Sequence, residues 1–244
     1  MIEKEYAYSE IFDSIQGEGH YTGRPTAWLR FFLCNLQCNG FGQKDPTNPE
    51  TYELPYKDFD LIKVNRMEEL PVWEYGCDSS YSWSKKFKHL QHHGSSKVIA
   101  DKIRDAFSNE WNDGKWLERH MCFTGGEPMM KHAQQCTVEI MQHYLNERDF
   151  PKFVTYETNG TQLLRNQTLH FYQEYRDRWG GECFISCSPK LWNVAGETNK
   201  RAIRPEIVKD YAMMTDSGQL KFVVNGTDAC WKELEEAIEA FRDH

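Results

Sequence analysis

The chain has 244 residues, and its proportions of hydrophobic (39%) and charged (27%) residues are ordinary for a globular protein. Its 29 Lys and Arg residues against 37 Asp and Glu residues give a formal net charge of −8, which argues against a general nucleic-acid binder. No window approaches the roughly 18 apolar residues of a membrane span, and the polar start MIEKEYAYSE does not resemble a signal peptide. We therefore expect one large domain in the cytoplasm, with no membrane or nucleic-acid partner.

Short apolar segments bounded by Gly, Pro or Asn recur along the chain, as buried parallel strands do. The five predicted strands are residues 27–33, 120–124, 152–158, 182–187 and 219–224. Three helical stripes are predicted between and after them: Val98, Ile99, Ile103, Phe107 and Trp111; Val138, Met141 and Leu145; and Trp231, Leu234, Ile238 and Phe241, with Asp228 as N-cap. This alternation predicts an α/β fold with right-handed crossovers, and five strands favour an open or partial barrel over a closed one.

Residues 39–76 interrupt the alternation, because they contain four Pro, many acidic residues and no long periodicity. Loops of this length are uncommon inside a compact domain and are often functional or inserted. We interpret the segment as an insertion after the first strand, with Cys38 immediately before it and Cys77 immediately after it.

The eight Cys residues fall into two groups. Five lie in apolar runs or helical patterns and are expected to be small buried hydrophobes: Cys122, Cys136, Cys183, Cys187 and Cys230. The other three lie in polar or Gly-rich loops: Cys34, Cys38 and Cys77. Thiolates in such an arrangement suit zinc or an iron–sulfur cluster, although unpaired structural Cys residues are an equally simple interpretation of the pair at 34 and 38.

Polar or metal-binding residues also cluster where predicted strands end. The first strand is followed by Cys34 and Cys38, the second by TGGEP (residues 124–128), the third by ETNG (157–160) and the fourth by SPK (188–190). Because ligands of α/β proteins bind at the carboxyl ends of parallel strands, these residues are predicted to form one site.

Several motifs, in fixed order, resemble those of the 7-carboxy-7-deazaguanine synthases, which are radical S-adenosylmethionine (SAM) enzymes. They are EIFDSIQGEG (residues 10–19), GRP (23–25) with Arg30, Cys34-x3-Cys38, Cys77-Asp78-Ser79, and the TGGEP, ETNG and SPK motifs. The Cys residues resemble the family's Cys-x3-Cys-x2-Cys-Asp-Thr segment, split here by residues 39–76. The likeness covers about residues 8–225, and so many ordered motifs rarely arise by chance. It implies a partial (β/α) barrel of the radical SAM type, formed by a single domain over residues 1–244 with an inserted loop in its cluster-binding segment.

The resemblance also implies cofactors and their ligands. Cys34, Cys38 and Cys77 would hold a [4Fe–4S] cluster whose open iron binds SAM, and an electron from the cluster would cleave SAM to a 5′-deoxyadenosyl radical. Gly125 and Gly126 would let the backbone approach SAM closely, with an ordinary turn as the alternative. Further implied SAM contacts are Glu127, Glu157, Asn159, Ser188, Pro189 and Lys190, and Ser79 replaces a family Thr that ligates Mg²⁺. A capped strand end remains the alternative for the ETNG residues.

The implied substrate is 6-carboxy-5,6,7,8-tetrahydropterin, and the implied reaction forms 7-carboxy-7-deazaguanine with loss of ammonia, for queuosine or modified-DNA synthesis. The implied substrate contacts are Ile15, Gln16, Gly17, Arg30 and Thr124. Arg30 suits this role because a guanidinium can bind a carboxylate bidentately. The resemblance further implies an electron donor such as flavodoxin and a possible homodimer.

Two features depart from the family pattern: the long insertion, and the lack of a match for a later strand whose Gln-Pro segment contacts SAM. We therefore expect the C-terminal wall of the SAM site to be rebuilt or absent. Two other functions stay open. One is a radical SAM activase of a glycyl-radical enzyme, against which residues 16–19 and Arg30 argue, and the other is a zinc-bound, non-catalytic binding module. Iron or zinc content after anaerobic purification separates the module from the enzymes.

Overall fold

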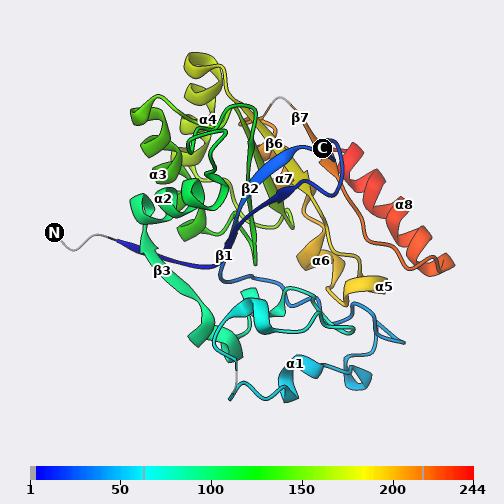
Figure 1. The fold of residues 1–244 in the computed structure, drawn as a ribbon. Coiled ribbons are helices and arrows are strands. Elements are labelled where there is room, and N and C mark those ends of the chain that lie inside the picture. Colours follow the sequence, from blue (N-terminus) through cyan, green and yellow to red (C-terminus); the bar gives the residue numbers. More distant parts are fainter. Residues whose placement is uncertain (1–3, 63, 216) are drawn as a thin grey trace.

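The computed structural model describes residues 4–62, 64–215 and 217–244. Its centre is a seven-stranded sheet with the strand order β3-β1-β2-β4-β5-β6-β7 (Figure 1). The strands are β1 (Glu5–Ile15), β2 (Pro25–Phe31), β3 (His92–Ser95), β4 (His120–Gly125), β5 (Phe153–Thr158), β6 (Glu182–Cys187) and β7 (Ser217–Leu220). Helices pack on this sheet, so the chain is a mixed α/β protein, as the alternation of apolar segments predicts.

The sheet has a parallel part and an antiparallel edge. Strands β2, β4, β5, β6 and β7 run parallel and follow one another in chain order. Strand β1 pairs antiparallel with β2, and β3 pairs antiparallel with β1. Because these five strands are parallel, all of their carboxyl ends lie at one edge of the sheet.

The helices of the crossovers bury the main core. They are α2 (Ser96–Phe107), α3 (Lys131–Glu147), α4 (Asn166–Trp179) and α7 (Pro205–Tyr211). Figure 1 shows α2, α3 and α4 grouped on one side of the sheet, and their apolar faces pack on the strands around the fully buried Phe123 and Met141. Cys122, Cys136, Cys183, Cys187 and Cys230 are all buried, as predicted.

The C-terminal helix α8 (Asp228–Arg242) packs against the short helix α5 (Trp192–Ala195), which α6 (Asn199–Ala202) follows. The buried carboxylate of Glu233 accepts hydrogen bonds from the backbone N–H groups of Trp192 (2.6 Å) and Asn193 (2.9 Å). No helix in the described part of the chain is both long and apolar enough to cross a membrane.

Two predictions about helix ends are wrong. Helix α2 ends at Phe107, and Trp111, expected on its apolar stripe, is 87% exposed. The side-chain oxygen of Asn109 accepts hydrogen bonds from the backbone N–H groups of Trp111 and Asn112, and this local turn competes with the helix. The N-cap of α8 is Thr227 rather than Asp228, which is the first helical residue.

Strand predictions differ from the structure at both edges of the sheet. The last strand ends at Leu220 instead of residue 224, because β6, its partner in the described part of the chain, ends at Cys187. Strands β1 and β3 were not predicted. The polar residues Glu10 and Asp13 interrupt the apolar character of β1, whose side facing the core carries the buried Tyr6 and Tyr8.

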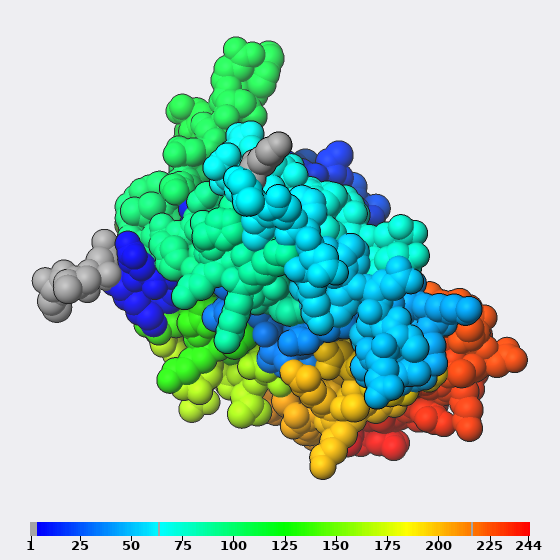
Figure 2. All heavy atoms as spheres, turned by 90° about the horizontal axis from the view of Figure 1, so that it is seen from below, coloured from blue at the N-terminus to red at the C-terminus, as the bar shows by residue number. Residues whose placement is uncertain are grey.

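The chain between β2 and β3, residues 32–91, is here called the β2–β3 segment; residue 63 lies outside its described part. Its described residues form only short helical turns: η1 (Pro49–Thr51), α1 (Pro55–Asp58), η2 (Met67–Glu69), η3 (Ser80–Ser82) and η4 (Lys85–Leu90). The segment has a small core of its own, made of Tyr56, Met67, Trp73, Phe87 and Leu90. Figure 2 shows much of it, in light blue and cyan, covering the face seen from below, beside the yellow and orange region of α5 and α6.

Candidate functional site

A cavity of about 1010 Å³ opens at the carboxyl edge of the parallel strands, where the β2–β3 segment covers them. It brings together all of the predicted site residues except two, Glu127 and Pro189. The predicted residues that line it are Ile15, Gln16, Gly17, Arg30, Cys34, Cys38, Cys77, Ser79, Thr124, Gly125, Gly126, Glu157, Asn159, Ser188 and Lys190.

The three candidate thiols pack around one small hydrophobic cluster with Leu36 and Ala195. Burial, aided by the charges of Glu127 and Cys77, raises the pKa of Cys34 to about 12. Burial likewise raises the pKa of Cys38 and of Cys77, and the charges of Cys34 and Cys77 both act on Cys38. The three side chains therefore meet in one cluster, although the sequence separates Cys38 and Cys77 widely.

The loop that carries Cys34 and Cys38 is shaped by backbone contacts. Cys38 has a left-handed conformation (φ 52°), and a buried carboxylate oxygen of Glu197 accepts hydrogen bonds from the backbone N–H groups of Gln37 (2.7 Å) and Cys38 (3.0 Å). A Cβ atom at Gly126 would lie 1.9 Å from the carbonyl oxygen of Leu33. The TGGEP turn therefore needs glycine at this position in order to sit against the thiol loop.

Cys77 reaches the same place because the two ends of the insertion meet. The backbone N–H of Gly76 donates to the carbonyl oxygen of Phe41 at 2.8 Å. A Cβ atom at Gly42 (φ +71°) would lie 2.5 Å from the carbonyl oxygen of Glu74, so these two stretches of backbone are in direct contact. Residues 39–76 thus leave the site and return to it.

Lys190 supplies positive charge beside the thiols. Its ammonium group donates to the hydroxyl oxygen of Ser188 at 3.0 Å and opposes the rise in pKa of all three thiols. Asn159 lies at the same place, since its side-chain amide donates to Asn35 at 3.1 Å and lies 3.8 Å from the sulfur of Cys34. Cation and amide are both groups that favour thiolate over thiol.

Glu127 does not line the cavity, but its side chain holds the neighbouring turns in place. Its buried carboxylate accepts hydrogen bonds from the backbone N–H groups of Met129 (2.9 Å) and Asn159 (2.8 Å) and from the hydroxyl of Thr158 (2.6 Å). Burial raises the pKa of Glu127, against these hydrogen bonds. The side chain therefore links the turn after β4 to the end of β5.

A second group of polar residues surrounds Glu157. One carboxylate oxygen of Glu157 accepts from the amide of Gln16 and the other from the hydroxyl of Thr124, each at 3.3 Å. Both of these partners are predicted substrate contacts, whereas Glu157 is predicted to contact SAM. Glu157, Arg30 and Lys221 all line the cavity, and the charges of all three act on the pKa of the buried Cys122.

Arg30 is held in place before any ligand binds. Its Nε atom donates to a carboxylate oxygen of Glu10 at 2.8 Å, its Nη1 atom donates to the carbonyl oxygen of Gly125 at 3.3 Å, and its guanidinium lies over the ring of Tyr81. Burial acts to lower the pKa of Arg30, and Tyr81 and Glu10 more than offset it. The guanidinium has five N–H donors, so three remain for a ligand.

Ser79 follows the third thiol at the rim of the cavity. Its hydroxyl donates to a carboxylate oxygen of Asp78 at 2.9 Å, and both residues line the cavity. The pair offers hard oxygen ligands of the kind that Mg²⁺ prefers. In the described residues, no group of three or more His, Cys, Asp or Glu side chains is arranged to hold a single metal ion.

Among the residues of the site that were not predicted are Glu10, Glu197 and Lys221. Lys221 lines the cavity directly after β7, donates to Glu18, and is followed by Phe222 and Val223 on the cavity wall. The rule that identified the ends of four strands missed Lys221, because the last strand was predicted to run to residue 224 and so to contain it. Glu197 follows no such pattern, because only the fold brings it to the thiol loop.

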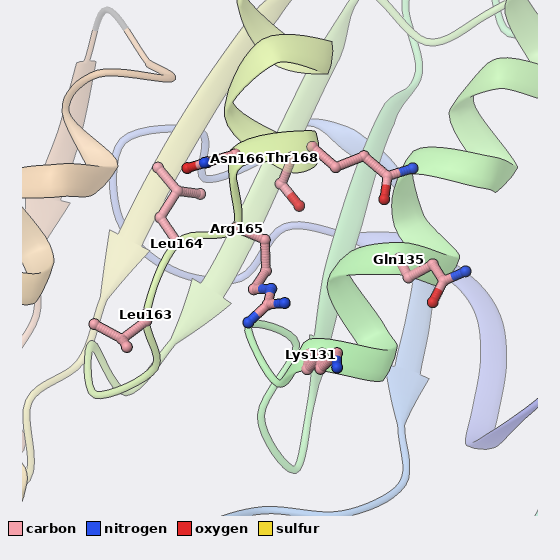
Figure 3. A pocket seen from close by; sticks show the side chains of 8 residues that line it. Lys131, Gln135, Leu163, Leu164, Arg165, Asn166 and Thr168 are labelled. Carbon is pink, nitrogen blue, oxygen red and sulfur yellow. The ribbon is translucent and has the colours of Figure 1, made fainter.

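A second, smaller cavity of about 420 Å³ lies between the first turn of α3 and the loop before α4 (Figure 3). Lys131 and Arg165 line it, and both are exposed. None of the predicted site residues lines this cavity, so the larger one is the candidate site.

The donor set of the larger cavity fits an iron–sulfur cluster. Three thiols from two loops, a nearby ammonium group and a largely apolar surround are the features with which proteins hold such clusters by Cys thiolates. The indole nitrogens of Trp28 and Trp73, both on the cavity wall, are buried donors without a partner in the described part of the chain. Buried donors of this kind suit a site that receives an acceptor.

Known proteins that resemble this chain include 7-carboxy-7-deazaguanine synthases. No family model matches the chain. It is 25% identical over 213 residues to a 7-carboxy-7-deazaguanine synthase of Buchnera aphidicola, covering 84% of this chain and 68% of that protein. It is 27% identical over 158 residues to a 7-carboxy-7-deazaguanine synthase of Thermoplasma acidophilum, covering 65% of this chain and 48% of that protein.

The crystal structure of QueE from Escherichia coli aligns with 97% of this chain and 91% of that chain, at 18% identity and a TM-score of 0.41, too low to establish a common fold. The sequence relatives carry the name of the family that the ordered motifs resemble, and the match extends over most of the chain. The chain is thus similar to 7-carboxy-7-deazaguanine synthases over most of its length.

Proposed function

We propose that the chain is a radical SAM lyase that converts 6-carboxy-5,6,7,8-tetrahydropterin to 7-carboxy-7-deazaguanine with release of ammonia. The observation that carries this proposal is the gathering of the motif residues around one cavity, from five strand ends and the β2–β3 segment. Five parallel strands in chain order support the finer proposal of a partial (β/α) barrel of the radical SAM type, in a single domain.

The thiol side of the cavity would hold the cofactors. Cys34, Cys38 and Cys77 would bind a [4Fe–4S] cluster, and the ammonium group of Lys190 would favour their thiolate forms. When bound, the cluster and SAM would supply one-electron chemistry that no side chain of the cavity provides. Gly125 and Gly126 would leave the backbone open to SAM, with Asn159, Ser188 and Lys190 beside it.

The Glu157 side of the cavity would orient the substrate. The free N–H donors of Arg30 suit the substrate carboxylate, and Lys221 adds a second cation nearby. Glu157 is held by two predicted substrate contacts, which favours a role as acceptor for N–H groups of the pterin ring rather than for SAM. This placement also favours a lyase over a glycyl-radical activase, which needs no such clamp.

Ser79 and Asp78 would supply oxygen ligands for Mg²⁺ at the rim, with the substrate completing the coordination. We further propose that the protein receives electrons from a donor such as flavodoxin, forms a homodimer and lies in the cytoplasm.

The test is an anaerobic assay of the reconstituted protein with SAM, a reductant, Mg²⁺ and the carboxy-tetrahydropterin. We expect the deazaguanine chromophore to appear together with 5′-deoxyadenosine. Cleavage of SAM without conversion of the pterin would contradict the lyase and favour an activase. A colourless protein that retains zinc and forms no cluster would contradict both enzymes.

A further inference from the structure

We propose that Gln219 is a positioning residue for the pterin, because it fastens the β1–β2 turn to the far edge of the sheet and so fixes Gln16 at the substrate. The β1–β2 turn is defined here as residues 16–24, between the ends of those two strands. The inference deepens the proposed function and rests on it, since Gln16 is one of the proposed substrate contacts.

The first observation is that Gln219 joins two elements that are far apart in the sequence. Its Nε2 atom donates to the hydroxyl oxygen of Ser186 on β6 at 2.9 Å, and its Oε1 atom accepts from the backbone N–H of His20 in the turn at 3.0 Å. Gln219 and Ser186 are direct neighbours in the ladder between β6 and β7. Because an amide carries a donor and an acceptor, one side chain can hold both the sheet and the turn.

The second observation is that the turn is shaped to fit against Gln219. Gly19 has a left-handed conformation (φ +73°), and a Cβ atom there would lie 2.1 Å from the Nε2 atom of Gln219. Glycine is therefore needed both for the backbone conformation and for the close approach of this side chain. Gly19 and Ser186 both line the candidate cavity, so Gln219 acts on the cavity through residues that form its wall.

The third observation is that the same part of the turn packs on β6. The ring of His20 stacks on Phe184 with ring centroids 5.6 Å apart, and Tyr21 packs edge to face on Phe184 at 5.0 Å. Phe184 and Ser186 flank Ile185, which belongs to the main core, so these two side chains point to the opposite face of the sheet. The hydrogen bonds of Gln219 add directional contacts to this packing.

Hydrogen bonds within the turn connect its fastened part to Gln16. The backbone N–H of Gln16 donates to the carbonyl oxygen of Arg24 at 2.8 Å, and its carbonyl oxygen accepts from the N–H of Gly23 at 2.8 Å. Its side-chain oxygen accepts from the N–H of Glu18 at 3.1 Å, while its amide nitrogen donates to Glu157 at 3.3 Å. A displacement of the far part of the turn therefore moves the amide that meets Glu157.

Loss of the Gln219 contacts would leave the turn with more conformations in the free protein. Binding of the pterin would then have to order the turn, and the cost of this ordering is subtracted from the affinity. The binding of SAM on the thiol side of the cavity would not bear this cost. We therefore expect a selective loss of affinity for the pterin.

The experiment measures equilibrium binding of the carboxy-tetrahydropterin to the reconstituted protein with SAM and without reductant, so that no turnover is needed. Gln219→Met keeps the length of the side chain and removes both polar groups. We expect its Kd for the pterin to rise about threefold to tenfold, with the Kd for SAM unchanged. Gln173→Met is the matched control, because the amide of Gln173, on α4, donates to the backbone of Met213 and does not contact the turn.

Two further variants separate positioning from a general structural role. Gln219→Glu should restore the affinity, because a carboxylate still accepts from the N–H of His20 and the hydroxyl of Ser186 can donate to its other oxygen. In a Gln16→Met background, Gln219→Met should change the Kd less than twofold, because residues that act through one another are not additive.

An unchanged Kd for the pterin in Gln219→Met, or an equal rise in Gln173→Met, would overturn the inference. So would a parallel loss of SAM affinity, a failure of Gln219→Glu to restore binding, or a full effect in the Gln16→Met background. If Gln219→Met does not fold, Gln219→Asn replaces it with the same expectation, because its shorter side chain cannot reach both partners. A wild type that binds SAM but no pterin would contradict the proposed function itself.

Discussion

The parallel part of the sheet and the β2–β3 segment contribute to the same cavity by different physical means. In the parallel part, a continuous backbone ladder joins β2, β4, β5, β6 and β7, and the side chains beneath it form the main core. In the β2–β3 segment the described residues contribute no strand, and a separate cluster around Tyr56, Trp73 and Phe87 holds the turns together. The first region places residues by hydrogen-bonded register, and the second places them by side-chain packing.

This difference teaches where the site is sensitive to change. The strand ends that carry Thr124, Glu157 and Ser188 are fixed by the sheet itself. Cys77 and Ser79 depend instead on the small core and on the contact between residues 41–42 and 74–76. We therefore expect damage to the small core to remove function while the sheet stays folded.

The largest expected effect comes from Cys77→Ala. This substitution removes the thiol that the β2–β3 segment brings to the other two, and we expect loss of the cluster, from about four irons to nearly none, and of SAM cleavage. Iron content and 5′-deoxyadenosine formation measure the effect. Cys136→Ala is the control, because Cys136 is buried in α3 away from the cavity. A Cys77→Ala protein with a SAM-cleaving cluster would refute the assignment.

Phe87→Ala tests the small core directly. Phe87 is fully buried in it, and truncation of such a Phe costs about 3–5 kcal/mol. We expect faster hydrogen exchange across the described parts of residues 52–90, with the protection of β4, β5 and β6 retained. Phe123→Ala, in the main core, should instead lower the global free energy of unfolding. Equal loss of protection in both regions would show that they unfold as one unit.

Arg30→Lys tests the part of the cavity around Glu157, where the strands of the sheet hold the side chains in place. The substitution keeps the charge but loses the fork of N–H donors, and we expect a loss of about 1.5–3 kcal/mol in pterin binding, roughly 10- to 150-fold in Kd. Equilibrium binding measures the effect, and circular dichroism checks the fold. Arg119→Lys is the control, because Arg119 pairs with Asp13 outside the cavity. Unchanged affinity in Arg30→Lys would reject the assignment.

Ser79→Ala is expected to act more narrowly. Removal of the hydroxyl should lower turnover at limiting Mg²⁺ and leave cluster content and SAM cleavage unchanged, because the thiols are untouched. Turnover is measured against Mg²⁺ concentration, with Ser108→Ala, at the end of α2, as the control. A wild-type response to Mg²⁺ would shift the role to Asp78.

The smallest expected effect is on the pH dependence of the free energy of unfolding, through His120 at the start of β4. Burial, aided by Arg24, lowers the pKa of His120 from 6.5 to about 4, and its ring stacks on Phe153. The unfolded state therefore binds more protons between these values, so the stability is complete above pH 6.5 and falls as the pH drops toward 4. We expect a loss of about 1–2 kcal/mol between pH 6.5 and 5, by urea unfolding. The same loss in His120→Gln would contradict this origin.

Much of the parallel part could be predicted from the sequence, because buried parallel strands are nearly continuous apolar runs. The predicted and observed strands agree closely for β4, β5 and β6. Strand β1 was not predicted because polar residues interrupt its apolar pattern. The end of β7 was predicted wrongly because the length of a strand depends on the strand it pairs with. Helix α2 ends early because Asn109 forms a local turn, a contact that apolar periodicity does not describe.

The sequence by itself identified most of the motif residues that line the cavity, since short motifs after successive strands meet where parallel strands end. Only the tertiary structure decided how the β2–β3 segment returns to the thiol loop, which buried acid holds that loop, and which charges surround Glu157. Glu197 reaches Cys38 from far along the chain, and Lys221 reaches the cavity from the last strand. The physical reason is that such contacts depend on side-chain packing and loop closure between distant residues, whose cost grows only slowly with separation and leaves no local pattern in the sequence.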